Sequence, residues 1–172
     1  MLMDTHSGNP CWDSAKHTAL IVEDDPRLQR AMSAQLARMD FCVLVASHYE
    51  GAIRRLAERE PHVVCIDVGL PTKSGYDLCE YIRGVLGWAG LPILVTSEYA
   101  SPQDMAYAED AGGNAFLHKP FSMGQLAQCI ESLANATPCS VPAVHELQAL
   151  AWKPVSSRYV TNQRAERGLF AA

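Results

Sequence analysis

No stretch of this sequence approaches the roughly 20 consecutive apolar residues that a membrane-spanning helix needs, so it predicts no membrane span. The first 17 residues contain Asp4 and no apolar core segment, which argues against a secretory signal peptide and makes the cytoplasm the expected location. The 6 cysteines form no Cys-x-x-Cys pair, and neither they nor the 6 histidines show zinc-ligand spacing. We therefore expect reduced thiols and no zinc site.

The sequence also lacks an excess of positive charge. It holds 14 Lys and Arg against 19 Asp and Glu, a formal net charge of −5, whereas a nucleic-acid-binding surface needs clustered cations. Residues 137–172 are mildly basic, with four Lys or Arg and two Glu, but they contain no helix-turn-helix pattern. Nucleic acid is therefore not an expected partner of this chain.

The chain is organised around the stretch VVCIDVGLPTKSG, residues 63–75. A short apolar run rich in Val and Ile that is stopped by Gly and Pro is typical of a fully buried strand in a parallel sheet. Asp67 then lies at the carboxyl end of that strand. In open α/β sheets this edge binds ligands, so the pattern favours a chemical role for Asp67.

Similar apolar runs alternate with helical patterns along the body of the chain. Strands are predicted at residues 18–23, 41–46, 62–67, 93–96 and 114–118, and helices at 26–39, 49–60, 76–85, 102–111 and from Ser122 onward. This alternation predicts an α/β fold, a doubly wound five-stranded parallel sheet in the order 2-1-3-4-5, with helices on both faces.

This fold would occupy only part of the chain. We expect a flexible N-terminal arm at residues 1–17, one domain at 18–136, and a linker and tail at 137–172. At 36 residues, the last segment is too short for an ordinary output domain, so it is either a disordered tail or a docking segment. Trp152, Arg158 and Tyr159 are either a docking motif or ordinary residues of such a tail.

Several predicted strands end in polar side chains. Glu23 and Asp24 follow the first strand, Asp67 ends the third, Thr96 ends the fourth, and Lys119 follows the fifth. In this sheet order the first and third strands are neighbours, so their carboxylates should converge in one crevice. Carboxylates that lie close together repel unless a cation joins them, and oxygen ligands without His or Cys favour Mg²⁺.

This arrangement suits phosphoryl transfer. Mg²⁺ and the Lys119 ammonium would offset the charge of a phosphoryl group while Asp67 attacks it in line and forms an acyl phosphate. The Thr96 hydroxyl can hydrogen-bond the product. The structural alternative is that Asp67 is a turn residue, Thr96 an ordinary strand residue and Lys119 a solvated surface charge.

Taken together and in this order, the motifs resemble the receiver domain of bacterial response regulators in two-component signalling. The resemblance covers about residues 18–136 and rests on IVEDDPRLQR, IDVGLPTKSG, LVTS and FLHKPF. It implies that Asp67 is the phosphoacceptor, that Thr96 is the switch hydroxyl and that Phe116 is the switch aromatic residue. It also implies that Lys119 contacts the phosphoryl group.

The resemblance implies further roles around the metal. Asp24 and Asp67 would bind Mg²⁺ directly, Glu23 through water, and Gly69 through its backbone carbonyl. The peptide bond between Lys119 and the following proline is expected to be cis. Movement of Thr96 toward the phosphoryl group would let Phe116 turn inward, although Phe lacks the hydroxyl of the Tyr that is commoner there.

The resemblance also implies the protein's partners. We expect phosphorylation by a sensor histidine kinase or a phosphotransfer protein, output by protein–protein contact to an unidentified target, and a monomer or weak homodimer. We expect no enzymatic activity beyond self-phosphorylation and self-dephosphorylation. An aspartyl-phosphate phosphohydrolase is disfavoured, because Gly69 stands where such an enzyme uses a second Asp.

Two alternatives remain at this stage. One is a receiver-like scaffold that works without phosphorylation, and the other is a transcriptional regulator that acts through the tail.

Gly69 and Glu98 occupy the positions that control the lifetime of the phosphoryl group in this family. Because Gly69 has no side chain to shield the acyl phosphate, we expect a phosphoryl state that is not exceptionally long-lived.

Overall fold

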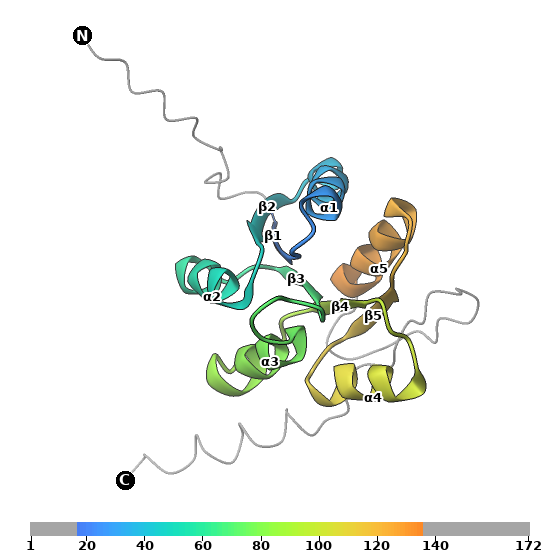
Figure 1. The fold of residues 1–172 in the computed structure, drawn as a ribbon. Coiled ribbons are helices and arrows are strands. Elements are labelled where there is room, and N and C mark those ends of the chain that lie inside the picture. Colours follow the sequence, from blue (N-terminus) through green and yellow to red (C-terminus); the bar gives the residue numbers. More distant parts are fainter. Residues whose placement is uncertain (1–16, 136–172) are drawn as a thin grey trace.

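The computed structural model describes residues 17–135 of the chain (Figure 1). Within this range, five parallel strands form one sheet in the spatial order β2-β1-β3-β4-β5. The strands are β1 (Thr18–Val22), β2 (Cys42–Ala46), β3 (Val63–Asp67), β4 (Ile93–Ser97) and β5 (Ala115–His118). The predicted doubly wound, flavodoxin-like fold is confirmed. The predicted arm, apart from His17, and the predicted tail lie outside the described residues.

All the helices except the last are crossovers between the parallel strands, and polar side chains fix where several helices begin. They are α1 (Pro26–Arg38), α2 (Tyr49–Glu58), α3 (Gly75–Glu80) with the π-helical η1 (Tyr81–Val85), α4 (Pro102–Asp110) and α5 (Met123–Asn135). Ser101 caps α4 by accepting the Asp104 backbone N–H, and Ser122 accepts the Gln125 backbone N–H at the start of α5. Both helices therefore begin where the sequence pattern predicted, at residue 102 and directly after Ser122.

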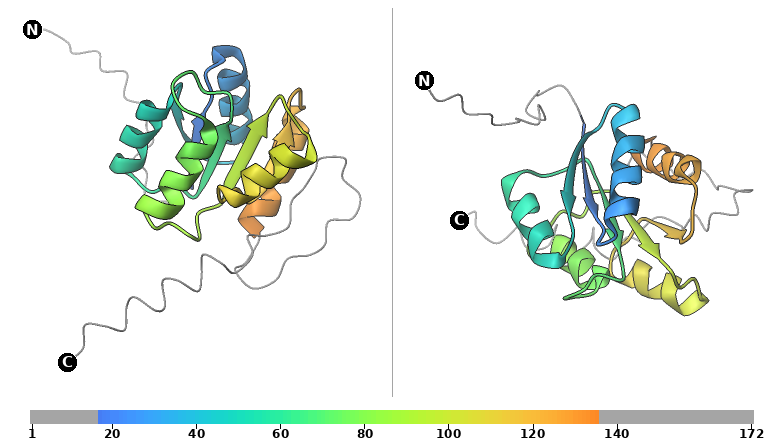
Figure 2. Two further views of the ribbon diagram at one scale, coloured as in Figure 1. Left: turned by 60° about the horizontal axis from the view of Figure 1, so that its bottom comes forward. Right: turned by 45° about the horizontal axis from the view of Figure 1, so that its top comes forward.

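The sheet separates two apolar cores. In Figures 1 and 2, α1 and α5 cover one face, and α2, α3 and α4 cover the other. Alternate residues of each strand point to opposite faces, so Leu20 belongs to the core beneath α2, α3 and α4, while Ile21 belongs to the core beneath α1 and α5. Every residue of β3 is buried, which explains why the apolar run before Asp67 is continuous.

The predicted single helix at residues 76–85 is wrong in its second half. The α-helix α3 ends at Glu80, and η1 continues with wider turns in which the Leu86 N–H bonds to the Tyr81 carbonyl at 3.1 Å. This wider turn carries Arg83 into the interior, where only 5% of the residue is exposed. A helical wheel drawn on the sequence does not predict that placement.

Arg83 explains why the helix departs from regular geometry here. Its guanidinium donates hydrogen bonds to the backbone carbonyls of Trp88, Leu91 and Gly112 and to the side-chain oxygen of Asn114. These acceptors belong to the loops that lead into β4 and β5. One side chain therefore joins η1 both to the loop that follows it and to the loop before β5, which is about 30 residues away in the sequence.

The expectation that all thiols are reduced does not hold for Cys42, which is disulfide-bonded. Cys65, Cys79 and Cys129 are free and buried. Burial raises the pKa of the Cys65 and Cys79 thiols to about 12, so both are protonated core residues without nucleophilic character. In the part of the chain that the structure describes, no helix has the length and apolar content to cross a bilayer.

Gly75 lets α3 begin against the strand that carries Asp67. A Cβ at residue 75 would lie only 2.2 Å from the backbone oxygen of Asp67, so the backbone would have to shift. We expect Gly75→Ala to lower the free energy of unfolding by about 1–3 kcal/mol in urea denaturation, because overpacking at a backbone contact is not easily relieved. The control is Gly84→Ala, where a Cβ meets nothing within 4 Å. Equal stability of the two variants would contradict the close-approach argument.

Candidate functional site

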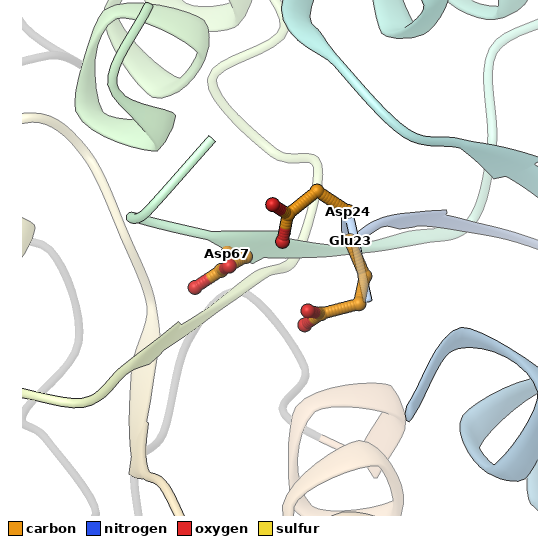
Figure 3. Close-up of side chains that lie close together, drawn as sticks. All are labelled: Glu23, Asp24 and Asp67. Carbon is orange, nitrogen blue, oxygen red and sulfur yellow. The ribbon is translucent and has the colours of Figure 1, made fainter. Parts of the chain in front are cut away.

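The predicted acidic residues meet at the carboxyl ends of β1 and β3. Glu23 and Asp24 directly follow β1, and Asp67 is the last residue of β3. Each offers a carboxylate oxygen, and these three atoms all lie within 4.8 Å of one another (Figure 3). Glu23 and Asp67 are buried, with 1% and 5% of each residue exposed, whereas Asp24 is exposed. The site therefore has a closed side formed by two carboxylates and an open side at Asp24.

Glu23 is the deepest of the three carboxylates. Burial raises its pKa, and the negative charge of Asp67 adds to that effect, while the hydrogen bond from Lys119 opposes it. Its Oε2 accepts a hydrogen bond from Lys119 Nζ at 2.8 Å, and its Oε1 accepts the Asp25 backbone N–H at 3.3 Å. Both carboxylate oxygens of Glu23 are therefore engaged.

Lys119 supplies the positive charge that these carboxylates require. Its Nζ lies 2.8 Å from Glu23 Oε2 and 3.0 Å from Asp67 Oδ2, and 13% of its side chain is exposed. Burial alone would lower the Lys119 pKa, but its hydrogen bonds to Glu23 and Asp67 outweigh burial and raise it. The Lys119–Pro120 peptide bond is cis, as the resemblance implied.

Thr96 lies beside Asp67, because residues 67 and 96 are register partners on β3 and β4. The residue is 1% exposed, and its hydroxyl is buried without a hydrogen-bond partner among residues 17–135. Leaving a buried hydroxyl unpaired costs about 1–3 kcal/mol, so such groups are uncommon in folded proteins. This unpaired hydroxyl indicates a position that a ligand oxygen is suited to fill.

Gly69 and Phe116, the two remaining predicted residues, lie in different surroundings. A Cβ at Gly69 would lie 3.5 Å from Asp67 Oδ2, which is ordinary contact distance, so residue 69 adjoins Asp67. Phe116 is fully buried and belongs to the core beneath α2, α3 and α4. The inward turn predicted for Phe116 therefore has no outward starting position in this structure. Its role as a switch stays a prediction.

Gln29 is a neighbour of the site that the sequence did not reveal. Its side-chain amide donates hydrogen bonds to the carbonyl oxygens of Glu23 and Ala46. In the sequence, Gln29 lies within the stretch IVEDDPRLQR, but nothing in the resemblance gave it a role. Only the packing of α1 against the ends of β1 and β2 shows this contact.

The donor set fits a hard divalent cation. Three carboxylates without His or Cys, one of them exposed, are the ligands that Mg²⁺ prefers, and the open side leaves room for water molecules. With Lys119 on the closed side, the site is also suited to hold an anionic group between two positive charges. An unpaired hydroxyl at Thr96 completes the polar surroundings of Asp67.

Comparisons with known proteins agree with this geometry. The sequence model of the family described as response regulator receiver domain matches residues 19–131 of the chain. The transcriptional regulatory protein KdpE of Mycobacterium tuberculosis is 37% identical over 106 residues, which cover 62% of this chain and 46% of KdpE. The phosphate regulon transcriptional regulatory protein PhoB of Shigella dysenteriae is 25% identical over 145 residues, which cover 84% of this chain and 63% of PhoB. The chain thus spans about half to two thirds of the length of these relatives.

Solved structures show the same similarity. A putative response regulator from Chloroflexus aurantiacus aligns with a TM-score of 0.65 and 28% identity, over 69% of this chain and 98% of that protein. A two-component response regulator from Clostridium difficile aligns with a TM-score of 0.66 over 70% of this chain and 98% of that protein. The second has 21% identity and supports the fold alone.

Removing Lys119 tests the electrostatic balance of the site. With EDTA at about pH 7, we expect Lys119→Met to lower the free energy of unfolding by about 3–5 kcal/mol, because Glu23 and Asp67 lose their buried cation. The loss should shrink at lower pH, since burial raises the pKa of Glu23 and that carboxyl takes up a proton at a higher pH than an exposed Glu does.

Lys73→Met is the matched control for this measurement, because Lys73 is an exposed lysine that lies over the Tyr49 ring, 4.5 Å from its centroid. It should cost no more than about 1 kcal/mol at either pH. A Lys119 variant as stable as this control would show that the two buried carboxylates do not depend on the ammonium.

Proposed function

We propose, starting from the fact that this chain belongs to the family of response regulator receiver domains, that it accepts a phosphoryl group on Asp67 and signals by protein–protein contact. Membership of the family implies a histidine kinase as partner, and the phosphoryl donor is that kinase or a phosphotransfer protein. The proposal includes a cytoplasmic location and no catalytic turnover of a separate substrate.

One observation carries the proposal: Asp67 contacts an ammonium and belongs to a cluster of three carboxylates. Its Oδ2 is 3.0 Å from Lys119 Nζ, which also contacts Glu23, and Glu23 and Asp24 complete the oxygen cluster. A structural carboxylate needs a single cation, whereas this one has Lys119 and a site suited to a second. A second cation there would offset the negative charge of an arriving phosphoryl group.

The proposed step is an in-line displacement at phosphorus. A carboxylate oxygen of Asp67 donates an electron pair to phosphorus, and the bond between phosphorus and the donor histidine nitrogen breaks. The electron pair of that bond stays on the imidazole, which takes up a proton from water. The product is an acyl phosphate on Asp67, and water hydrolyses it back to the carboxylate and inorganic phosphate.

The chain's own groups hold this phosphoryl group in place. Lys119 lies where it can donate to one phosphoryl oxygen, and the unpaired Thr96 hydroxyl can donate to another. Glu23, Asp24 and Asp67, with the Gly69 carbonyl as the family implies, would hold Mg²⁺. When bound, Mg²⁺ offsets the negative charge of the carboxylates and of the phosphoryl oxygens.

Signalling then depends on how strands β4 and β5 respond to the phosphoryl group on Asp67. A phosphoryl group adds about −1.5 to −2 charges at the edge where Thr96 lies. Movement of Thr96 toward that charge would alter the packing around Phe116, because residues 95 and 116 are register partners on β4 and β5. Since Phe116 is already buried, we infer that the change passes through the backbone of these strands and through α4 rather than through a large ring rotation.

A second candidate is a transcriptional regulator that contacts DNA through residues 137–172 of this chain. The names of KdpE and PhoB describe transcriptional regulators, and both proteins extend well beyond the region that matches. An electrophoretic mobility test of the full chain with DNA, with and without a phosphodonor, distinguishes this candidate from signalling by protein contact alone.

Phosphorylation itself is tested with a small-molecule phosphodonor and Mg²⁺. We expect intact-mass spectrometry to show the addition of one phosphoryl group to the wild-type chain and none to Asp67→Asn. The control is Asp40→Asn, which changes an exposed Asp whose backbone has a φ of 62°, a conformation that Asn accepts well. Equal labelling of wild type and Asp67→Asn would favour the scaffold interpretation.

The lifetime of the phosphoryl group is a separate prediction. After removal of the donor, we expect the wild type to lose its label well within hours in Mg²⁺ buffer, because residue 69 offers no side chain to exclude water. Gly69→Leu should slow the loss, since a Cβ there touches Asp67 at 3.5 Å and the longer side chain would cover it. Gly90→Leu, where a Cβ meets nothing within 4 Å, is the control. A wild-type half-life of many hours would contradict this prediction.

A further inference from the structure

We propose that Gln29 is a positioning residue of the acidic site, whose side-chain amide holds the backbone of Glu23 and thereby sets the affinity of the site for Mg²⁺. The inference rests on the proposed function, because it assumes that Glu23, Asp24 and Asp67 bind this cation. The proposed phosphoryl transfer does not itself require Gln29. It follows from three groups of contacts at the corner between β1 and α1.

The first group is formed by the amide of Gln29 itself. Its Nε2 donates to the Glu23 carbonyl at 3.1 Å and to the Ala46 carbonyl at 3.2 Å. The Ala46 carbonyl also accepts the Glu23 backbone N–H at 3.0 Å. Gln29 therefore joins the end of β1 to the end of β2 at the residue where the chain leaves the sheet.

The second group fixes the same corner from the start of α1. Asp25 caps the helix by accepting the Arg27 backbone N–H at 2.8 Å, and the Gln29 backbone N–H bonds to the Asp25 carbonyl at 2.9 Å. The main chain of Gln29 thus anchors residue 25, and its side chain anchors residue 23. Asp24 lies between these two anchors, so its backbone is held from both sides.

The third group shows why the backbone matters for the carboxylates. Glu23 Oε1 accepts the Asp25 N–H and Oε2 accepts from Lys119, so the direction of this side chain depends on where residues 23 and 25 lie. Glu23 comes after the last residue of β1, and Asp24 is exposed. Neither is fixed by side-chain packing alone. The carbonyl contact from Gln29 supplies an additional constraint.

Gln29 is also accessible enough for its hydrogen bonds to be lost without collapse of the core. It is half-buried and lines a cavity of about 360 Å³ between α1, β2 and α2, together with Ala46, Ser47, His48 and Arg54. Water in this cavity can replace the missing donor after substitution, so the expected effect falls on geometry more than on stability. Groups that orient metal ligands typically change metal affinity by about 10–100-fold when they are removed.

The test is the substitution Gln29→Met, which keeps the length of the side chain and removes the donor. The Mg²⁺ dissociation constant, measured by NMR titration of the unphosphorylated full chain, should rise about tenfold. In the metal-free protein, the backbone amide signals of Asp24 and Asp25 should also shift. The control is Gln35→Met on the same helix, another half-buried glutamine, which should change neither quantity.

The two variants should unfold at similar temperatures, so that a difference in Mg²⁺ affinity is not a consequence of lost stability. If Gln29→Met does not fold, Gln29→Asn replaces it, because an amide one methylene shorter cannot reach both carbonyls and should weaken Mg²⁺ binding by the same mechanism. If the folded variant bound Mg²⁺ with wild-type affinity, the proposed positioning role of Gln29 would be overturned. Failure of the wild type itself to bind Mg²⁺ would overturn the proposed function and this inference together.

Discussion

The contact of Lys119 with Glu23 and Asp67 is the interaction on which the rest of the site depends. Two carboxylates buried at the ends of neighbouring strands repel each other, and burial penalises the charge of Glu23. An ammonium 2.8 Å from one and 3.0 Å from the other offsets this cost. Lys119 comes from the far side of the sheet, since it follows β5, and the site therefore forms only when β1, β3 and β5 are all in register.

The same arrangement explains why the domain tolerates the charges of Glu23, Asp67 and Lys119 in its interior. Apolar cores on both faces of the sheet make the strands rigid, and the strand ends hold their polar groups at fixed positions. Gly75 lets α3 start directly against Asp67, so the loop between them is short and closely packed. Stability is concentrated in the cores, while the edge keeps an unpaired hydroxyl at Thr96 and an exposed carboxylate at Asp24. Such unsatisfied groups at a binding edge are a usual sign of function.

The chain belongs to the response regulator receiver family, and its acidic cluster is consistent with the Mg²⁺ site of that family. Phe116 is fully buried without phosphorylation, and it has no hydroxyl that could make a hydrogen bond in that position. Residues 84–135 contain four Glu or Asp in the loop before α4 and in α4, one in α5, and Lys119 as their only Lys or Arg. A dimer held by salt bridges between two copies of this side would lack exposed cations in this range.

The sequence by itself determined the alternation of strands and helices, the sheet order and the convergence of Glu23, Asp24 and Asp67, because these follow from local periodicity and from the geometry of parallel sheets. Only the tertiary structure decided the burial of Arg83, the π-helical turn of η1, the disulfide-bonded state of Cys42, the inward position of Phe116 and the contact of Gln29 with Glu23. The physical reason is distance along the chain. Arg83 bonds to acceptors as far away as residue 114, and Gln29 bonds to residue 46, so the preferred place of each side chain depends on segments that no local pattern describes.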